Sequence, residues 1–191
     1  MTPILSILTP AVPSRMAQLA KLCDELARQI GGLAVEHLTL LDNKRRTVGE
    51  KRDALLRAAR GAYVAFVDDD DWIEHNYVRE LLGAMEANPD VITFQQCATV
   101  NNDNSLVMFR LGHGNDAFRP DGVTLRNAWH VCAWRRTLAI QSRFPANSFG
   151  EDWAFAEPLC RIAKTEIHIQ KVLHFYRHSA ETTEAPAPNG Y

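Results

Sequence analysis

Four consecutive carboxylates at 68–71, in the segment GAYVAFVDDDDW, are the residues with the clearest chemical potential in this chain. Like charges a few ångströms apart repel by roughly 1 kcal/mol per pair even in water, so the group needs a compensating positive charge. Asp71 and Glu74 have the spacing of a capping box, so a helix N-terminus could compensate Asp71. A helix has only one N-cap residue, so capping can account for only one of the four carboxylates. We therefore expect the other carboxylates to bind a divalent cation, Mn²⁺ or Mg²⁺, which prefers oxygen ligands.

The acidic group also implies a phosphorylated ligand, because a cation held by one or two carboxylates completes its shell with water and substrate phosphates. Lys51 and Arg52 fall in the first turn of an expected helix, where cations oppose the helix dipole unless an anion lies nearby. Asp42 and Asn43 end an earlier strand and could hydrogen-bond a base or ribose. Alternatively, the lysine and arginine side chains of residues 44–52 form a solvent-exposed basic face that binds no phosphate.

The elements that position these residues follow from hydrophobic periodicity. Apolar runs and helical spacing predict strands at 4–10, 33–42 and 62–68, alternating with helices at 14–32 and 48–61. Downstream, we expect a helix at 72–88, a hairpin of 91–100 with 105–112, a loop-rich stretch at 113–131, a helix at 151–165 and an extended segment at 166–178.

This order predicts an α/β fold with a mostly parallel sheet flanked by helices and a small antiparallel extension. A single domain is expected over 1–180, followed by a mobile, Pro-rich tail at 181–191. Ligands of open parallel sheets bind beyond the carboxyl ends of the strands, which is where the four carboxylates lie.

Composition limits the function classes. A chain of 191 residues with 46% hydrophobic and 23% charged residues suits one soluble domain, and a net charge of -2 gives no general footprint for nucleic acid or anionic membranes. No apolar run approaches the roughly 18 residues of a membrane span, so we expect no membrane insertion. The four cysteines form no CxxC pair, and the N-terminus lacks the pattern of a signal peptide, so a cytoplasmic location is expected.

Several motifs together resemble the inverting family-2 glycosyltransferases of the GT-A (Rossmann-like) fold. These motifs are LSILTP, LLDN, GEKRDALLRAARGAYVAFVDDDDW and FGEDWAF. The resemblance covers 4–82 closely and 150–178 more loosely, with 113–135 largely outside it. It implies transfer from a nucleotide sugar, expected to be a UDP-sugar. Because the QxxRW motif of processive polysaccharide synthases does not occur, it implies transfer of a single sugar.

The resemblance also implies residue roles. For the nucleotide, it implies that Thr9 and Ala11 line the base, that Asp42 binds the base, and that Lys51 and Arg52 form a basic pair. Asp68 and Asp69 are implied to face the nucleotide sugar. Asp70 is implied to ligate the metal, with His178 of HFYRH, or His174 as the second choice, as a further metal ligand. Asp152 is implied to be the general base, with Glu151 in support. Inverting transfer independently requires a carboxylate that takes the acceptor's proton, although an acidic helix N-terminus is the alternative for this pair.

The segment WHVCAWRR at 129–136 has no role in the shared pattern. Its aromatic planes could stack on a sugar or base and its guanidinium groups could meet phosphate. We hypothesise that it lines the acceptor cleft through Trp129, Trp134, Arg135 and Arg136, with ordinary core tryptophans beside a cationic edge as the alternative.

The expected acceptor is a saccharide or glycoconjugate. The second candidate is hydroxymethylated DNA, which the acidic balance of the chain disfavours. Two further classes fit the acidic group, namely a nucleotidyltransferase, which would not need Asp152, and a silent nucleotide-binding module.

Overall fold

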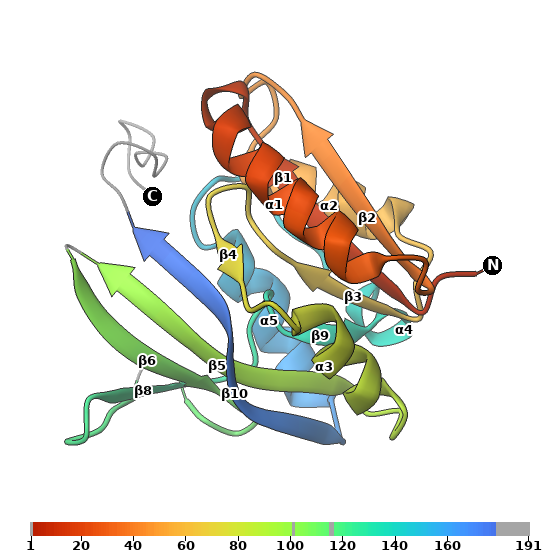
Figure 1. Ribbon diagram of the computed structural model, residues 1–191. Coiled ribbons are helices and arrows are strands. Elements are labelled where there is room, and N and C mark those ends of the chain that lie inside the picture. The colour runs from red at the N-terminus through yellow and green to blue at the C-terminus, as the bar shows by residue number, and fades with distance from the viewer. Residues whose placement is uncertain (1, 101, 115–116, 179–191) are drawn as a thin grey trace.

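The computed structural model describes residues 2–100, 102–114 and 117–178. Its described part is built on a mixed sheet with the strand order β2-β1-β3-β9-β5-β6-β8-β7, and β10 pairs with β5 and β4 (Figure 1). The strands are β1 (Leu5–Ala11), β2 (Val35–Leu41), β3 (Tyr63–Phe66), β4 (Trp72–Ile73), β5 (Val91–Val100), β6 (Asp103–Phe109), β7 (Ala117–Phe118), β8 (Val123–Arg126), β9 (Ala133–Arg135) and β10 (Glu166–His178).

The helices cover both faces of this sheet. They are a short 3-10 turn (Pro13–Arg15), α1 (Met16–Ile30), α2 (Val48–Ala58), α3 (Tyr77–Met85), α4 (Arg136–Ala139) and α5 (Glu151–Ile162). Figure 1 shows α1 and α3 on one face, with α2, α4 and α5 on the other. This arrangement confirms the predicted α/β class with its mostly parallel sheet.

The parallel core consists of β2, β1 and β3, as predicted. Leu5 of β1 pairs with Val35 on one side and Tyr63 on the other, and every residue of β1 is buried. The sequence of a central strand that is buried on both faces is a nearly continuous apolar run, without the alternation of apolar and polar residues seen in half-exposed strands. The antiparallel pair of β5 and β6 confirms the predicted hairpin.

The helix expected at 72–88 has a different start in the structure. The helix predicted from residue 72 begins at Tyr77, because Trp72 and Ile73 form β4 and pair with β10. The residue that caps α3 is Asn76, whereas the Asp71 carboxylate lies 3.2 Å from the Nε2 atom of His174. The predicted capping box at Asp71 is therefore wrong.

Gly49 lets the start of α2 approach the segment 145–148 closely. A Cβ atom on Gly49 would lie 1.9 Å from the Pro145 carbonyl oxygen. The Gly49 amide donates to the Asn147 carbonyl at 2.9 Å, and the Val48 amide donates to Ser148 Oγ at 3.2 Å. These contacts satisfy amides that a helix start leaves unpaired, and they place the beginning of α5 beside α2.

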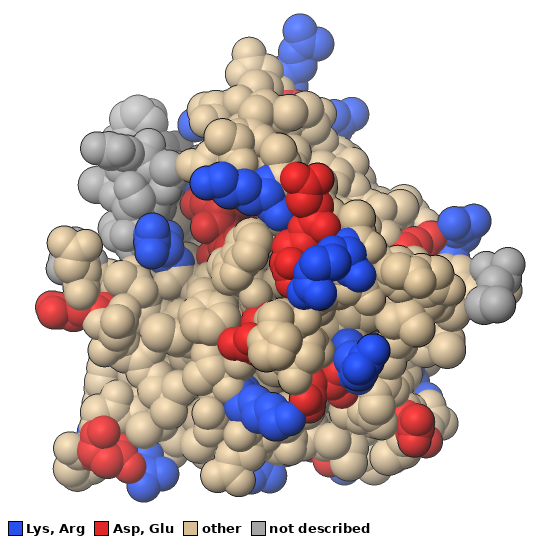
Figure 2. Space-filling model, in the orientation of Figure 1, with Lys and Arg blue, Asp and Glu red and all other residues tan. Residues whose placement is uncertain are grey.

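The surface carries charges of both signs. On the face shown in Figure 2, lysine and arginine side chains are interspersed with aspartate and glutamate. None of the helices in the described ranges is long and apolar enough to cross a bilayer. The predicted mobile tail at 181–191 lies outside the described residues.

Candidate active site

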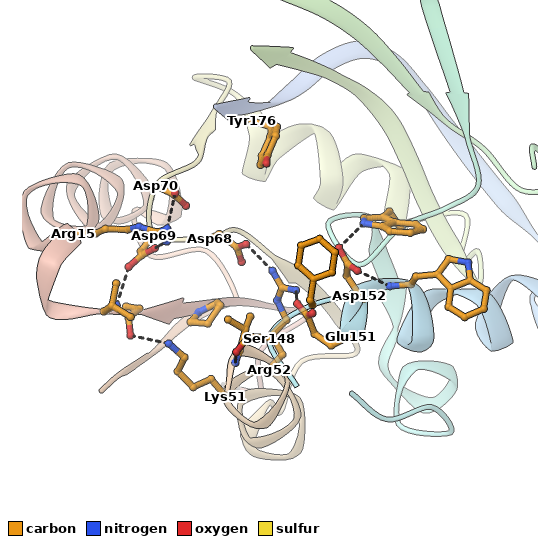
Figure 3. Close-up of a pocket in the computed structure, with 18 of the residues that line it drawn as sticks. Arg15, Lys51, Arg52, Asp68, Asp69, Asp70, Ser148, Glu151, Asp152 and Tyr176 are labelled. Carbon is orange, nitrogen blue, oxygen red and sulfur yellow. Dashed lines mark hydrogen bonds and ion pairs between the residues drawn. The ribbon is translucent and has the colours of Figure 1, made fainter. Parts of the chain in front are cut away.

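A cleft of about 560 Å³ lies at the carboxyl ends of β1 and β3. Its walls are the loops after these two strands, the first turns of α2 and α5, the segment 148–150 and the end of β10 (Figure 3). This is the edge at which open parallel sheets bind ligands. The acidic turn 68–70 and the pair Glu151–Asp152 both face this cleft.

Asp69 ties the acidic turn to the loop after β1. Its carboxylate accepts from the Val12 amide at 2.9 Å and from the Arg15 guanidinium at 2.8 Å, and its side chain is only 2% exposed. A second nitrogen of Arg15 lies 3.1 Å from Asp70. Arg15, which was not among the predicted site residues, supplies part of the positive charge that the carboxylates require.

Asp70 retains an excess of negative surroundings. Burial, together with the neighbouring Asp71, Asp68 and Asp69, raises the pKa of Asp70 to about 7, and Arg15 offsets only part of this rise. A cation at this carboxylate would relieve the repulsion, so the residues fit an oxygen-ligated divalent ion. No group of three or more His, Cys, Asp or Glu side chains in the described ranges is arranged to hold a metal.

Arg52 connects the two ends of the cleft. Its guanidinium lies 2.6 Å from Asp68 and 2.5 Å from Glu151, and its side chain is 4% exposed (Figure 3). Burial opposes its charge, but the two carboxylates together raise the pKa of Arg52 above its usual value. Burial would raise the pKa of Asp68, but the Arg52 guanidinium lowers it. Burial keeps the pKa of Glu151 raised.

Lys51 lies beneath the loop after β1. Its Nζ atom donates to the Ala11 carbonyl at 3.3 Å and lies 3.8 Å from Asp42. Ala11 lines the cleft. Asp42 is not among the residues that line it, and it also pairs with Arg46 at 3.4 Å.

Thr9 lies outside the cleft. It is fully buried, and its hydroxyl lies 3.0 Å from the His37 ring. The residues of this strand end that line the cleft are Pro10, Ala11 and Val12. The predicted lining role of Thr9 is therefore wrong, because β1 continues past it to Ala11.

Asp152 occupies the other end of the cleft, in the first turn of α5. Its Oδ2 atom accepts from the Trp129 indole N–H at 3.2 Å, and its Oδ1 atom accepts from the Trp153 amide at 2.7 Å. His130 Nδ1 lies 4.0 Å from Oδ2. Burial, followed by repulsion from Arg52, lowers the pKa of His130 to about 3, so this ring is neutral near pH 7. The carboxylate of Asp152 thus accepts from two neutral donors, the Trp129 indole and the Trp153 amide.

The structure separates the residues predicted to line one acceptor cleft. Trp129 lines the cleft, but Trp134 is fully buried. Arg135 pairs with Asp90 and stacks on Tyr63, and with Arg136 it lines a different hollow where β3 begins. The hypothesis is wrong for the last three residues. The antiparallel strand β9 places Trp134 and Arg135 beside the first residues of β3, and Arg136 follows at the start of α4, away from the carboxyl ends of β1 and β3.

Other cleft residues were missed. Phe149 is 64% exposed and Trp153 is 46% exposed, and both flank the acidic pair of α5. The signal was available, since both aromatic residues stand in FGEDW. From HFYRH, the cleft contains Tyr176 and Arg177, which the prediction passed over in favour of the histidines.

The two histidines of that segment have different outcomes. His174 is fully buried and pairs with Asp71 and Gln96 instead of lining the cleft. His178 ends β10, and its side chain lies outside the described part of the structure.

A Rossmann-like sheet whose carboxyl edge gathers an acidic turn, a basic helix start and a second acidic helix start is the architecture of the GT-A glycosyltransferases. Residues 18–144 match Glycosyl transferase family 2, and the chain belongs to this family. The resemblance inferred from the motifs is confirmed. Glycosyltransferase GlyA of Streptococcus pneumoniae serotype 4 is 28% identical over 151 residues, which cover 67% of this chain but 22% of GlyA.

Solved structures of Staphylococcus aureus TarS have a similar fold. TarS 1-349 in complex with UDP matches with a TM-score of 0.67 at 16% identity, over 93% of this chain and 61% of that chain. The complex with UDP-GlcNAc matches with a TM-score of 0.68 at 15% identity, over 94% and 60%. This likeness confirms the predicted GT-A fold. The chain spans about three fifths of these TarS chains and less than a quarter of GlyA.

Proposed function

We propose that this chain transfers one sugar from a UDP-sugar to a hydroxyl group of a saccharide or glycoconjugate, with inversion at the anomeric carbon. The observation that carries the proposal is that one cleft holds the acidic turn 68–70 at one end and the Asp152 carboxylate at the other. A leaving diphosphate and an entering hydroxyl need opposite sides of the same carbon, and this cleft offers a separate site for each.

The donor occupies the end of the cleft formed by the loop after β1 and the start of α2. Lys51 and Arg15 line the cleft and offer cationic groups to the diphosphate, and Asp42, 3.8 Å from Lys51, recognises the base. The buried Oδ1 atom of Asp42 lies 3.8 Å from Lys51 Nζ and has no hydrogen-bond partner in the described part of the chain, so it can accept from an N–H group of a nucleobase. Family membership and the UDP-bound TarS structures support uridine as the nucleoside.

Asp70 would hold a divalent ion, Mn²⁺ or Mg²⁺, together with the donor, and Asp68 would face the ion or the ribose. When bound, it neutralises the charge that develops on the diphosphate. The support is the crowding of carboxylates that raises the Asp70 pKa.

Asp152 acts as the general base. It takes the proton of the acceptor hydroxyl while the acceptor oxygen bonds to the anomeric carbon, and the bond from that carbon to the diphosphate oxygen breaks with its electron pair on UDP. Glu151 supports this step indirectly, because it holds Arg52 at 2.5 Å and so fixes the start of α5 against the acidic turn.

The acceptor enters past the aromatic rim of Phe149 and Trp153, whose exposed rings suit the apolar faces of a sugar. The net charge of -2, and the mixed charges on the face shown in Figure 2, do not favour nucleic acid, which draws on a basic surface.

Calorimetric titration with UDP tests the donor site. We expect UDP to bind in the presence of Mn²⁺, to lose most of its affinity in EDTA, and to compete better than GDP. Lys51→Ala should weaken UDP binding about tenfold or more, the equivalent of about 1.4 kcal/mol, while Lys21→Ala, on the exposed side of α1, should not. No UDP binding by the wild-type protein would overturn the proposal.

A further inference from the structure

The segment WHVCAW, which has no donor role, forms a rigid turn against α5. The Trp129 carbonyl accepts from the Trp134 indole at 2.8 Å and from the Cys132 amide at 3.1 Å. The Cys160 thiol of α5 donates to the Ala128 carbonyl at 3.2 Å. Because Trp134 is fully buried in β9, the backbone of Trp129 is fixed to both the sheet and the helix that carries Asp152.

Two consecutive rings of this turn approach the same oxygen atom. The Trp129 indole N–H donates to Asp152 Oδ2 at 3.2 Å, and His130 Nδ1 lies 4.0 Å from that oxygen. His130 is 6% exposed, and its Nδ1 atom has no hydrogen-bond partner in the described ranges. Buried ring nitrogens normally have a partner, and a shift of about 1 Å would bring this one within hydrogen-bond distance of Asp152.

The faces of the Trp129 ring are less suited to binding a sugar. The Arg126 guanidinium lies over this ring, 5.2 Å from its centre. One face is therefore covered, and the indole N–H is already bonded to Asp152. These contacts favour a role for Trp129 through its N–H rather than through its aromatic plane.

We propose that Trp129 and His130 are positioning residues that fix the Asp152 carboxylate by holding Oδ2, so that Oδ1 meets the acceptor hydroxyl. Oδ1 accepts only the Trp153 amide among its contacts within the described residues and so retains a lone pair for the proton. This inference rests on the proposed function, in which Asp152 is the base. It replaces the hypothesis that Trp129 stacks on the acceptor.

Paired substitutions separate the two roles. Trp129→Phe keeps an aromatic plane but removes the donor, whereas Trp129→Gln removes the plane but keeps an N–H group at similar reach. The probe is UDP-GlcNAc with water as acceptor, measured by UDP release in Mn²⁺, and UDP affinity is measured by calorimetry. Trp72→Phe is the matched control, since Trp72 is 42% exposed and does not line the cleft.

We expect Trp129→Phe to lower the rate of UDP release about 10- to 100-fold, the effect of losing a hydrogen bond to a charged group, with UDP affinity unchanged. Trp129→Gln should retain more activity than Trp129→Phe. The reverse order, or an equal loss of UDP affinity, would overturn the proposal. For His130, the Asn variant should retain more activity than the Leu variant, because Asn keeps a donor near the Nδ1 position.

A spectroscopic measurement tests the contact without catalysis. In ¹⁵N-labelled protein, Asp152→Asn should shift the Trp129 indole N–H signal and leave the Trp72 signal in place, and an unmoved Trp129 signal would refute the proposal. If the wild-type protein failed to bind UDP, the proposed function would fail instead, and the indole signal would still report on the positioning contact.

Discussion

Replacing Asp70 with asparagine should stabilise the protein when no metal is present. The pKa of this carboxyl is raised from an ordinary 3.8 to about 7, chiefly by burial and by the neighbouring carboxylates. Each unit of difference between folded and unfolded states is worth about 1.36 kcal/mol. Ionised Asp70 therefore costs up to about 4 kcal/mol at pH 8, with little reduction for solvent because the side chain is 19% exposed.

The direction of the pH dependence follows from the number of protons bound to the folded and unfolded states. The folded protein keeps the Asp70 proton up to about pH 7, whereas the unfolded chain releases it near 3.8. Folding is therefore weakened as the pH rises from about 4 to about 7. The advantage of Asp70→Asn should be largest at pH 8 and should fall to about 2 kcal/mol at pH 5.

Thermal unfolding in EDTA measures this effect. A gain of about 4 kcal/mol corresponds to roughly 10 °C in Tm for a protein of this size. Asp24→Asn, on the exposed side of α1, is the control and should change little. Mn²⁺ with UDP should raise the Tm of the wild-type protein but not that of Asp70→Asn. A variant no more stable than wild type at pH 8 would refute the reasoning.

Three other substitutions test the site and its supports. Asp152→Asn should slow sugar transfer from labelled donor by about 10²- to 10⁴-fold with UDP affinity unchanged; a normal rate would remove Asp152 from the base role. Arg52→Met should lower the free energy of unfolding in urea by about 3–5 kcal/mol, and Arg52→Lys should recover only part, because an ammonium group lacks the planar fork of donors. Full recovery by lysine would contradict the bridge. Gly49→Ala places a methyl group 1.9 Å from the Pro145 carbonyl oxygen and should cost about 1–3 kcal/mol or more in the same assay. Gly83→Ala, in α3 with open space around it, should instead stabilise by about 0.5–1 kcal/mol, and equal effects would contradict the close approach.

Features encoded by local pattern were predicted well. The alternation of β1, α1, β2, α2 and β3 follows from hydrophobic periodicity, and Gly31 ends α1 in the left-handed conformation expected there. The acidic turn and the pair Glu151–Asp152 were found because each is a short motif at the end of an element.

Features that depend on distant pairing were missed. Trp72 and Ile73 have a helical context in sequence, but they form β4 because β10, about a hundred residues later, offers strand partners. Trp134 was placed in the acceptor cleft because nothing in its neighbours reveals that β9 would insert between β3 and β5. Arg15 was missed for a similar reason, since its carboxylate partners lie more than fifty positions away.

The ion triplet of Asp68, Arg52 and Glu151 limits how this domain can be recombined. The Arg52 guanidinium pairs both with Asp68 at the nucleotide end of the cleft and with Glu151 at the general-base end, and its side chain is only 4% exposed. A chimaera that joined the first half of this chain to the second half of a relative would need an acidic residue where Glu151 stands. Otherwise the buried network would lose one partner. Rim side chains such as Phe149 are free of this constraint, so new acceptor preferences are most readily engineered there.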